Sequence, residues 1–382
     1  MKVIVLGGAG DVGSRAAEEI ATTPGTTLLT IADRNEDAAK LLQKKLLENS
    51  RVKCEVRIAI VDAFVHHSLV SAIEGHDVAA SALGPFHLFE EKCARASIDA
   101  KVNYCSVCDD YNAAEDVLDK LQAVAQRNGV IVITGFGATP GTSNIAASIM
   151  ASHMDVATDV HISCFQPLNA GGGEAVLRHM LFVLSGQLPV WRDGRRVVVP
   201  ACSSSKKVEF PKYGNVTVWT MGHAEPVTLH RYMPTLRNVE YKMGFGFGSR
   251  CLIWPSYYLG LFRFKVVVTV TIWFFSWLDL LFKKWPKGNG ALRVDVYGIK
   301  NGKPCHEMAC GVGEMREVTG VSLAVGALML GSRVGISVSG GGVFAPEGSV
   351  DSNIFHNWMA DKGFKSFSNL EMTIPFTGDS LA

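Results

Sequence analysis

A glycine-rich turn between a strand and a helix constrains this chain more than any other feature. The sequence Gly-Ala-Gly-Asp-Val-Gly begins at Gly8, between a β-branched run at residues 3–6 and a helical pattern over residues 11–22. In this setting Gly8 permits a tight turn, Gly10 lets the backbone approach a pyrophosphate, and Gly13 lets the helix pack closely on the strand. The first N–H groups of the helix then face the phosphates. The pattern predicts a dinucleotide-binding turn.

An acidic residue follows this turn at the spacing that such sites use. Asp33 comes twenty residues after Gly13, at the end of the next expected strand, where its carboxylate would hydrogen-bond the adenosine ribose. Asp33 would repel a 2′-phosphate, whereas Arg34 would bind one or stack on adenine, so of the two NAD(P) cofactors NAD is favoured. Asp62 and Ala63 follow a third strand near the expected adenine, and residues 82–85 follow a fourth near the nicotinamide ribose. The residues predicted to bind the cofactor are Gly8, Gly10, Asp11, Val12, Gly13, Asp33, Arg34, Asp62, Ala63, Ala82, Leu83, Gly84 and Pro85.

The first 135 residues alternate short β-branched runs with helical stretches, which predicts an α/β fold with a doubly wound parallel sheet of the Rossmann type. The expected strands are 3–6, 27–32, 56–61, 78–83, 101–105 and 130–134, and the expected helices are 11–22, 35–49, 68–73, 88–99, 112–128 and 143–153.

The middle of the chain has a different texture, because strand patterns follow one another there with few helices. We expect an antiparallel sheet in an inserted α+β domain, since an apolar helix at residues 318–330 restores the first pattern. The expected strands are 159–164, 196–199, 207–210, 216–221, 238–241, 291–299 and 305–311. The predicted divisions are a dinucleotide-binding domain at 1–140, an inserted substrate and dimerisation domain at 141–317, and a C-terminal return at 318–382.

Composition excludes several classes of protein. The 37 Lys and Arg nearly cancel the 36 Asp and Glu, and this net charge of +1 gives no reason to expect a nucleic-acid partner. Apolar residues make up 48% of the chain, which excludes disorder. Nine scattered cysteines favour a reducing, cytoplasmic location, and no secretion signal is expected because the N-terminus runs directly into the glycine turn.

Four segments resemble the saccharopine dehydrogenase family, which includes saccharopine reductase, lysine dehydrogenase and carboxynorspermidine dehydrogenase. They are residues 7–14, residues 83–86 with 102–104, residues 135–144, and residues 319–324 through 342–347. The Pro-Gly-x-Ser-Asn element from Pro140 and the closing Pro346-Glu347 are the most specific. The resemblance implies a Rossmann domain interrupted by a substrate domain, and a pyridine nucleotide enzyme that acts on a C–N bond.

Candidate catalytic and substrate-binding residues follow from position. His87 lies at the carboxyl edge of the expected sheet as a proton donor, with a surface or packing role as the alternative. Arg178 would pair with an anion and His179 would move a proton, unless both belong to a solvated helix face. The turn at residues 135–144 would offer N–H groups to a substrate carboxylate, or act only as a hinge. The predicted substrate-binding residues are Phe86, Gly137, Thr139, Pro140, Gly141 and Gly173.

No metal site is expected, because the CxxC of Cys105 and Cys108 has no second pair of ligands.

An apolar segment at residues 252–285 leaves the substrate open. Its uninterrupted apolar run covers only residues 266–278, whereas a membrane span needs about 20 residues. Residues 266–272 have the β-branched composition of a strand, but Trp273 and Trp277 recur at helical spacing. The segment is a buried or dimer element, a lipid-surface anchor followed by lysines, or the wall of a pocket for a hydrophobic substrate.

Three functions follow from these patterns. The first is a cytoplasmic, homodimeric NAD(P)-dependent oxidoreductase that acts at an amine or imine centre of an amino-acid or polyamine-like small molecule. The second is an NAD(P)H-dependent reductase of a hydrophobic carbonyl or alkene, in contact with a membrane surface through residues 252–285. The third is a non-catalytic sensor of nucleotide redox state.

Overall fold

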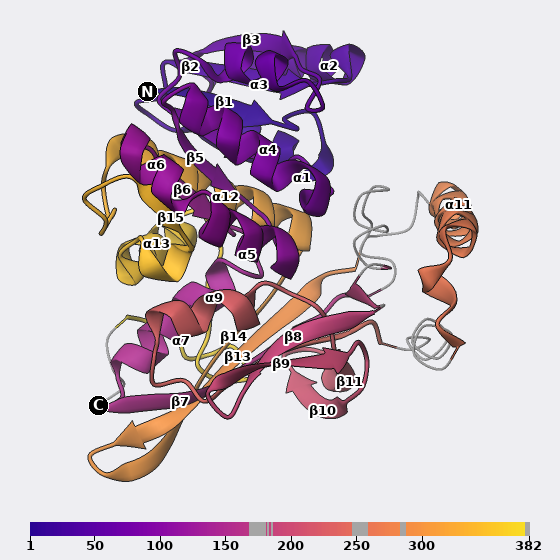
Figure 1. Ribbon diagram of the computed structural model, residues 1–382, viewed down its shortest axis with the longest axis vertical. Helices are drawn as coiled ribbons and strands as arrows, with labels where there is room; N and C mark the ends of the chain where they lie inside the picture. The colour runs from indigo at the N-terminus through magenta and orange to yellow at the C-terminus, as the bar shows by residue number, and fades with distance from the viewer. Residues whose placement is uncertain (168–180, 182, 185, 247–258, 283–287, 379–382) are drawn as a thin grey trace. The chain divides into compact units, whose positions relative to one another are not determined.

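The protein, described here by a computed structural model, forms two units (Figure 1). The structure describes residues 1–167, 181, 183–184, 186–246, 259–282 and 288–378. Unit 1 comprises Met1–Ile145 and Arg316–Gly363, and unit 2 comprises Ala146–Met315 and Phe364–Ala382. The C-terminal part therefore differs from the expected division at 318–382. Phe367 exchanges two backbone hydrogen bonds of 2.8 Å with Cys310 of unit 2, which holds the tail to that unit.

Unit 1 is built on a seven-stranded sheet in the described residues, in the order β15-β6-β5-β4-β1-β2-β3 with every pairing parallel. The predicted doubly wound fold is confirmed. The strands are β1 (Lys2–Leu6), β2 (Leu28–Asp33), β3 (Glu55–Ile60), β4 (Val78–Ser81), β5 (Asn103–Ser106), β6 (Ile131–Thr134) and β15 (Gly342–Phe344). β15 is a strand of three residues in the C-terminal segment, and it was not predicted from the sequence.

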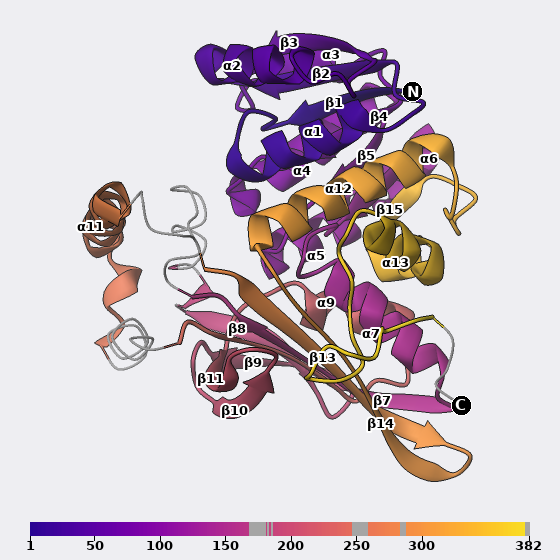
Figure 2. The same cartoon turned by 180° about the vertical axis from the view of Figure 1, so that it is seen from behind.

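Helices cover both faces of this sheet. On one face α3, α4, α5 and α6 bury a cluster that includes Leu69, Cys93, Val117 and Leu121 against the strands. On the other face α1 and α12 lie side by side (Figure 2). The helices of unit 1 are α1 (Asp11–Thr22), α2 (Glu36–Leu47), α3 (His66–Ile73), α4 (Phe86–Asp99), α5 (Tyr111–Lys120), α6 (Gln122–Asn128), α12 (Met315–Ser332) and α13 (Ser352–Asp361). The boundary between the units falls within α7 (Thr142–Ser152).

Unit 2 contains an eight-stranded sheet in its described part, with the main order β10-β11-β12-β7-β13-β14. In addition, β8 pairs with β12, and β9 pairs with β8. The sheet is mixed and not antiparallel as predicted, because β12 and β7 pair in parallel over seven residues. The strands are β7 (Val156–Phe165), β8 (Gln187–Arg192), β9 (Arg195–Pro200), β10 (Ser205–Phe210), β11 (Gly214–Thr220), β12 (Asn238–Gly244), β13 (Gly290–Lys300) and β14 (Lys303–Gly313), and helix α9 spans Glu225–Tyr232.

The apolar segment is helical where it is described. α11 (Lys265–Phe282) includes residues 266–272, so the strand-like interpretation of their β-branched composition is wrong. Ile272 is buried against Leu181 and Phe262, and this packing outweighs a helix-propensity cost of a few tenths of a kcal/mol per β-branched residue. In the described residues no helix is both long enough and apolar enough to cross a membrane.

The return of the C-terminal segment to unit 1 can be tested at Phe355 of α13. Phe355 is 1% exposed, and its ring stacks on Phe136 with centroids 5.7 Å apart. We expect Phe355→Ala to lower the free energy of unfolding of unit 1 by about 3–5 kcal/mol, measured by urea denaturation. Val334→Ala, at an exposed position of the same unit, is the control and should change it by less than about 0.5 kcal/mol. Equal effects of the two substitutions would contradict this packing.

Candidate functional site

The turn between β1 and α1 forms a cradle that only glycine can line. A Cβ on Gly13 would lie 2.1 Å from the carbonyl oxygen of Gly7, and one on Gly8 would lie 2.7 Å from that of Val5. Gly10 is the N-cap of α1 and supplies no side chain to the helix end. In the described part of the chain, no acceptor meets the N–H groups of Val12 and Gly13. These donors at the positive end of a helix are suited to phosphate oxygens.

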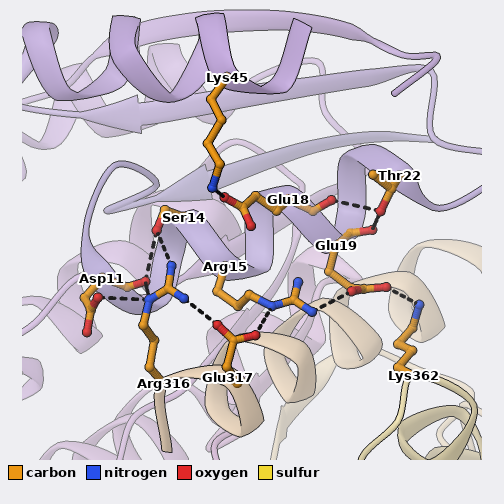
Figure 3. A network of polar contacts seen from close by, with 10 residues as sticks. All are labelled: Asp11, Ser14, Arg15, Glu18, Glu19, Thr22, Lys45, Arg316, Glu317 and Lys362. Atoms are coloured by element: carbon orange, nitrogen blue, oxygen red, sulfur yellow. Dashed lines mark hydrogen bonds and ion pairs between the residues drawn. The ribbon is translucent and has the colours of Figure 1, made fainter. Parts of the chain in front are cut away.

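Charged side chains surround the start of α1 (Figure 3). The Arg316 guanidinium donates from Nε to the Asp11 carboxylate at 2.9 Å and from Nη2 to Ser14 Oγ at 3.1 Å. Arg316 also pairs with its neighbour Glu317, which accepts from Arg15 Nε at 2.5 Å. Arg316 was not predicted from the sequence, in which it lies 305 residues from Asp11.

Asp33 lies at the end of β2 beside the glycine turn. Its carboxylate accepts from the Ala9 N–H at 3.1 Å and from the Asn35 N–H at 3.0 Å, which fixes both oxygens at the sheet edge. Arg34 is exposed, and Asp62 is exposed with one oxygen accepting from the Phe64 N–H at 2.9 Å.

The strand end at β4 comes very close to the glycine turn. A Cβ on Gly7 would lie 3.1 Å from both the Ala82 oxygen and the Leu83 Cα. The structure therefore brings the predicted residues 82–85 next to the phosphate turn. Gly84 and Pro85 are joined by a cis peptide bond, and Pro85 is the N-cap of α4.

His87 in the first turn of α4 has an acidic partner that the sequence analysis missed. The Asp110 carboxylate is almost fully buried, accepts from the His87 N–H at 2.9 Å, and lies 3.4 Å from Nδ1 of the imidazole. A carboxylate in this position fixes the orientation of the ring. The only signal in the sequence was the acidic pair Asp109 and Asp110 after β5.

A buried carboxyl group lies one turn further along α4. Glu90 accepts hydrogen bonds from Ser106 Oγ at 2.6 Å, Thr134 Oγ1 at 2.8 Å and Tyr104 Oη at 2.9 Å. Burial raises the pKa of Glu90, which favours its neutral form. The three hydroxyls come from β5 and β6, so this group holds α4 against the sheet.

The turn at residues 135–144 uses many of its own N–H groups within unit 1. The N–H groups of Gly137, Thr142 and Ser143 donate to backbone oxygens of the same turn at 2.8–3.2 Å. Ala138 N–H meets Thr319 Oγ1 at 3.4 Å. The buried Asn144 amide donates to Glu347 at 2.9 Å, which links the two segments most specific to the resemblance. Of the four residues of this turn that were predicted to contact substrate, Gly137 already uses its N–H and Pro140 has none. An N–H contact to substrate would therefore come from Thr139 or Gly141.

Three predicted residues, Gly173, Arg178 and His179, lie outside the described residues. Phe86 is half-buried in the first turn of α4. Within the described ranges, no group of three or more His, Cys, Asp or Glu side chains is arranged to hold a metal ion.

Unit 2 carries a polar row that the sequence analysis did not predict. Thr220, Lys242, Ser163 and Arg293 are register partners across four adjacent strands. Lys242 is buried and pairs with Glu240 at 2.9 Å, and Arg293 pairs with Asp295 at 2.8 Å.

Lys206 and His161 lie on the same face of the sheet as this row. Lys206 is half-buried and lies 3.1 Å from Nδ1 of His161, and burial together with the Lys242 charge lowers the pKa of Lys206. The fully buried hydroxyl of Ser163 has no hydrogen-bond partner in the described part of the chain. Lys206, Lys242 and Arg293 place three cations on this face beside the carboxylates of Asp159, Glu240 and Asp295. Ammonium and guanidinium groups of this kind bind anions by charge-assisted hydrogen bonds.

The glycine cradle, the helix N-terminus and Asp33 define unit 1 as a dinucleotide-binding domain of the Rossmann type. Residues 3–133 match the family described as saccharopine dehydrogenase NADP binding domain. This match confirms the predicted resemblance to the saccharopine dehydrogenase family and the predicted NAD(P) cofactor class.

Two further comparisons give a relative in sequence and a protein of similar fold. The chain is 27% identical over 266 residues to carboxynorspermidine synthase of Vibrio alginolyticus, a match that covers 63% of this chain and 62% of that protein. The fold is similar to that of the saccharopine dehydrogenase (L-Glu forming) of Saccharomyces cerevisiae, with a TM-score of 0.69, 14% identity, and coverage of 96% of this chain and 99% of that chain. The predicted α/β fold with a second sheet domain is confirmed by this likeness.

The glycine cradle yields a direct test. Because a Cβ on Gly13 would collide with the Gly7 carbonyl, Gly13→Ala must displace α1 from the turn. We expect the Kd of NADH or NADPH, measured by fluorescence titration, to rise at least about tenfold. Gly340→Ala is the matched control, since a Cβ there meets nothing within 4 Å, and it should leave that Kd unchanged. If Gly13→Ala leaves the cofactor affinity unchanged, the glycine turn does not bind the cofactor as predicted.

Proposed function

We propose that this chain is an NAD(P)-dependent oxidoreductase of the saccharopine dehydrogenase type that acts at the C–N centre of an amino-acid or polyamine-like substrate. The observation that carries the proposal is the glycine turn with Asp33 fixed beside it, in a segment that matches the NADP binding domain of that family. The carboxynorspermidine synthase of Vibrio alginolyticus supports a substrate that bears both an amine and a carboxylate.

Each part of the site has a task in this proposal. The bound nicotinamide cofactor supplies or accepts the hydride. The N–H groups of Val12 and Gly13 hold the diphosphate, and Asp33 accepts from the ribose hydroxyls, which favours NAD over NADP. His87 exchanges a proton with the substrate nitrogen, while the Asp110 carboxylate orients its ring. The remaining predicted residues, among them Arg34, Asp62, Ala63, Arg178 and His179, stay candidates for adenine and substrate contacts.

The polar row of unit 2 and the neighbouring Lys206 support a substrate that carries a carboxylate. Lys206, Lys242 and Arg293 share one face of the sheet with the unpartnered hydroxyl of Ser163. Guanidinium and ammonium groups at such a face would bind a carboxylate by charge-assisted hydrogen bonds. We also propose a homodimer and a cytoplasmic location.

The proposal is tested by turnover and by one substitution. NADH and NADPH oxidation is followed with a panel of oxo acids paired with amino acids and diamines, and reverse reduction of the cofactors with the corresponding secondary amines. We expect His87→Gln to lower kcat about 100-fold while the Kd of the cofactor stays constant, because only the proton transfer is affected.

The matched control for His87→Gln is His66→Gln. His66 is also paired with an aspartate, 2.9 Å from Asp99, but it lies on α3 with half of its side chain exposed. This control should retain full activity. Turnover that is unaffected by His87→Gln would remove His87 from the mechanism, and no turnover with any substrate, despite cofactor binding, would favour a non-catalytic redox sensor.

A second candidate function rests on α11. Val266, Val270, Trp273 and Trp277 follow each other at intervals of four, three and four residues, and each is 47–74% exposed. An apolar stripe of this kind, followed in sequence by Lys283, Lys284 and Lys287, favours contact with an anionic lipid surface and a hydrophobic carbonyl or alkene substrate.

Flotation with anionic liposomes separates the two candidates. If α11 binds lipid, the wild-type chain should float, and a Val270→Glu/Trp273→Glu variant should remain at the bottom because two charges would enter the interface. The control is Val198→Glu, at an exposed position of β9 in the same unit. A wild-type chain that does not float would rule out the lipid-surface role.

A further inference from the structure

The charged residues around the start of α1 form a network of ion pairs in which positive and negative side chains alternate. Asp11 pairs with Arg316, Arg316 with Glu317, Glu317 with Arg15, Arg15 with Glu19 at 2.9 Å, and Glu19 with Lys362 at 2.7 Å. The carboxylates and cations of this network are equal in number, so the network as a whole is neutral. In Figure 3, Asp11 lies at one end of this network and Lys362 at the other. Asp11 is the first residue of α1 and directly follows the glycine turn.

Asp11 occupies an unfavourable place for a phosphate-binding turn. It is the first residue of α1, and its own helix offers the Val12 and Gly13 N–H groups to the diphosphate. A carboxylate at a helix N-terminus is favourable by itself, because it interacts with the positive end of the dipole. Beside a diphosphate, however, the same carboxylate repels the ligand, and it reduces the positive electrostatic potential that would bind the phosphates.

Arg316 forms an ion pair with Asp11 that reduces this repulsion. Its Nε donates to the Asp11 carboxylate at 2.9 Å and to the Asp11 carbonyl at 3.0 Å. Its Nη2 donates to Ser14 Oγ at 3.1 Å, one turn further along α1. The guanidinium therefore spans the first turn of the helix, and its charge cancels that of Asp11.

We propose that Arg316 is a positioning residue for the dinucleotide: it neutralises Asp11 at the phosphate turn, so that cofactor affinity depends on the Arg316–Asp11 pair. This inference rests on the proposed dinucleotide function of unit 1. It differs from a purely structural role, in which Arg316 would only hold α12 against α1.

A double-mutant cycle distinguishes these roles. The Kd of NADH and of NADPH is measured by calorimetry at low and at high salt for wild type, Asp11→Asn, Arg316→Gln and the double variant. We expect Arg316→Gln to raise the Kd about tenfold at low salt, and less at high salt, because an uncompensated carboxylate then faces the diphosphate. The double variant should return to within about threefold of wild type, since it lacks that carboxylate.

The Asp11→Asn variant tests the same proposal without removing Arg316. Its side chain is nearly isosteric and exposed, and the substitution removes the negative charge at the turn while Arg316 keeps Glu317 as its carboxylate partner. We expect tighter cofactor binding with a steeper dependence on salt. Weaker binding in Asp11→Asn would overturn the proposal even if Arg316→Gln did not fold.

Arg15→Gln is the structural control. Arg15 links α1 to α12 through Glu317 and to Glu19 within α1, further from the glycine turn. Its loss should lower thermal stability but leave the Kd unchanged. The proposed role of Arg316 fails, while the proposed function stands, if Arg316→Gln behaves like Arg15→Gln or if the double variant binds the cofactor no better than Arg316→Gln. If the wild-type protein binds neither NADH nor NADPH, the proposed function fails as well.

Discussion

The close approach of α1 to the end of β1 is the constraint on which the rest of unit 1 depends. Because a Cβ at Gly13 would lie 2.1 Å from the Gly7 oxygen, the helix can begin at this place only with glycine there. The same turn donates the Gly8 N–H to Ala32 of β2 and the Ala9 N–H to Asp33. One backbone conformation therefore fixes both the donors suited to a diphosphate and the carboxylate suited to a ribose.

The chain leaves unit 1 after residue 145 and returns at residue 316, and its second segment is held there by packing and charge as well as by the pairing of β15 with β6. Two glycines of α12 allow this packing: a Cβ at Gly320 would lie 2.7 Å from the Arg15 Cβ, and one at Gly326 would lie 2.6 Å from the Phe136 ring. Each glycine in a helix costs about 1 kcal/mol relative to alanine. The close contact of α12 with α1 and with Phe136 offsets that cost, and it accounts for part of the high glycine content of the chain.

Local sequence patterns predicted the helices and strands of unit 1 well. They failed where contacts between residues far apart in the sequence determine strand pairing or secondary structure. α1 was expected at residues 11–22 and spans Asp11–Thr22, because its start is set by the glycine turn and its face by helical periodicity. The parallel pairing of β12 with β7 has no local signal, since about 70 residues separate strands that look alike in isolation. Residues 266–272 were misjudged because burial of Ile272, which the sequence does not reveal, outweighs β-branched propensity.

The candidate site shows the same division between local and distant control. Glycines and Asp33 could be read from the sequence because the backbone of one short segment determines what they do. The partners of the charged groups could not: Asp110 lies 23 residues from His87, and Arg316 lies 305 residues from Asp11. The turn thus provides the hydrogen-bond donors, while the electrostatic field at the turn is set by residues from other segments. A substitution in the first turn of α12 can therefore change the charge that a diphosphate meets without altering the backbone that binds it.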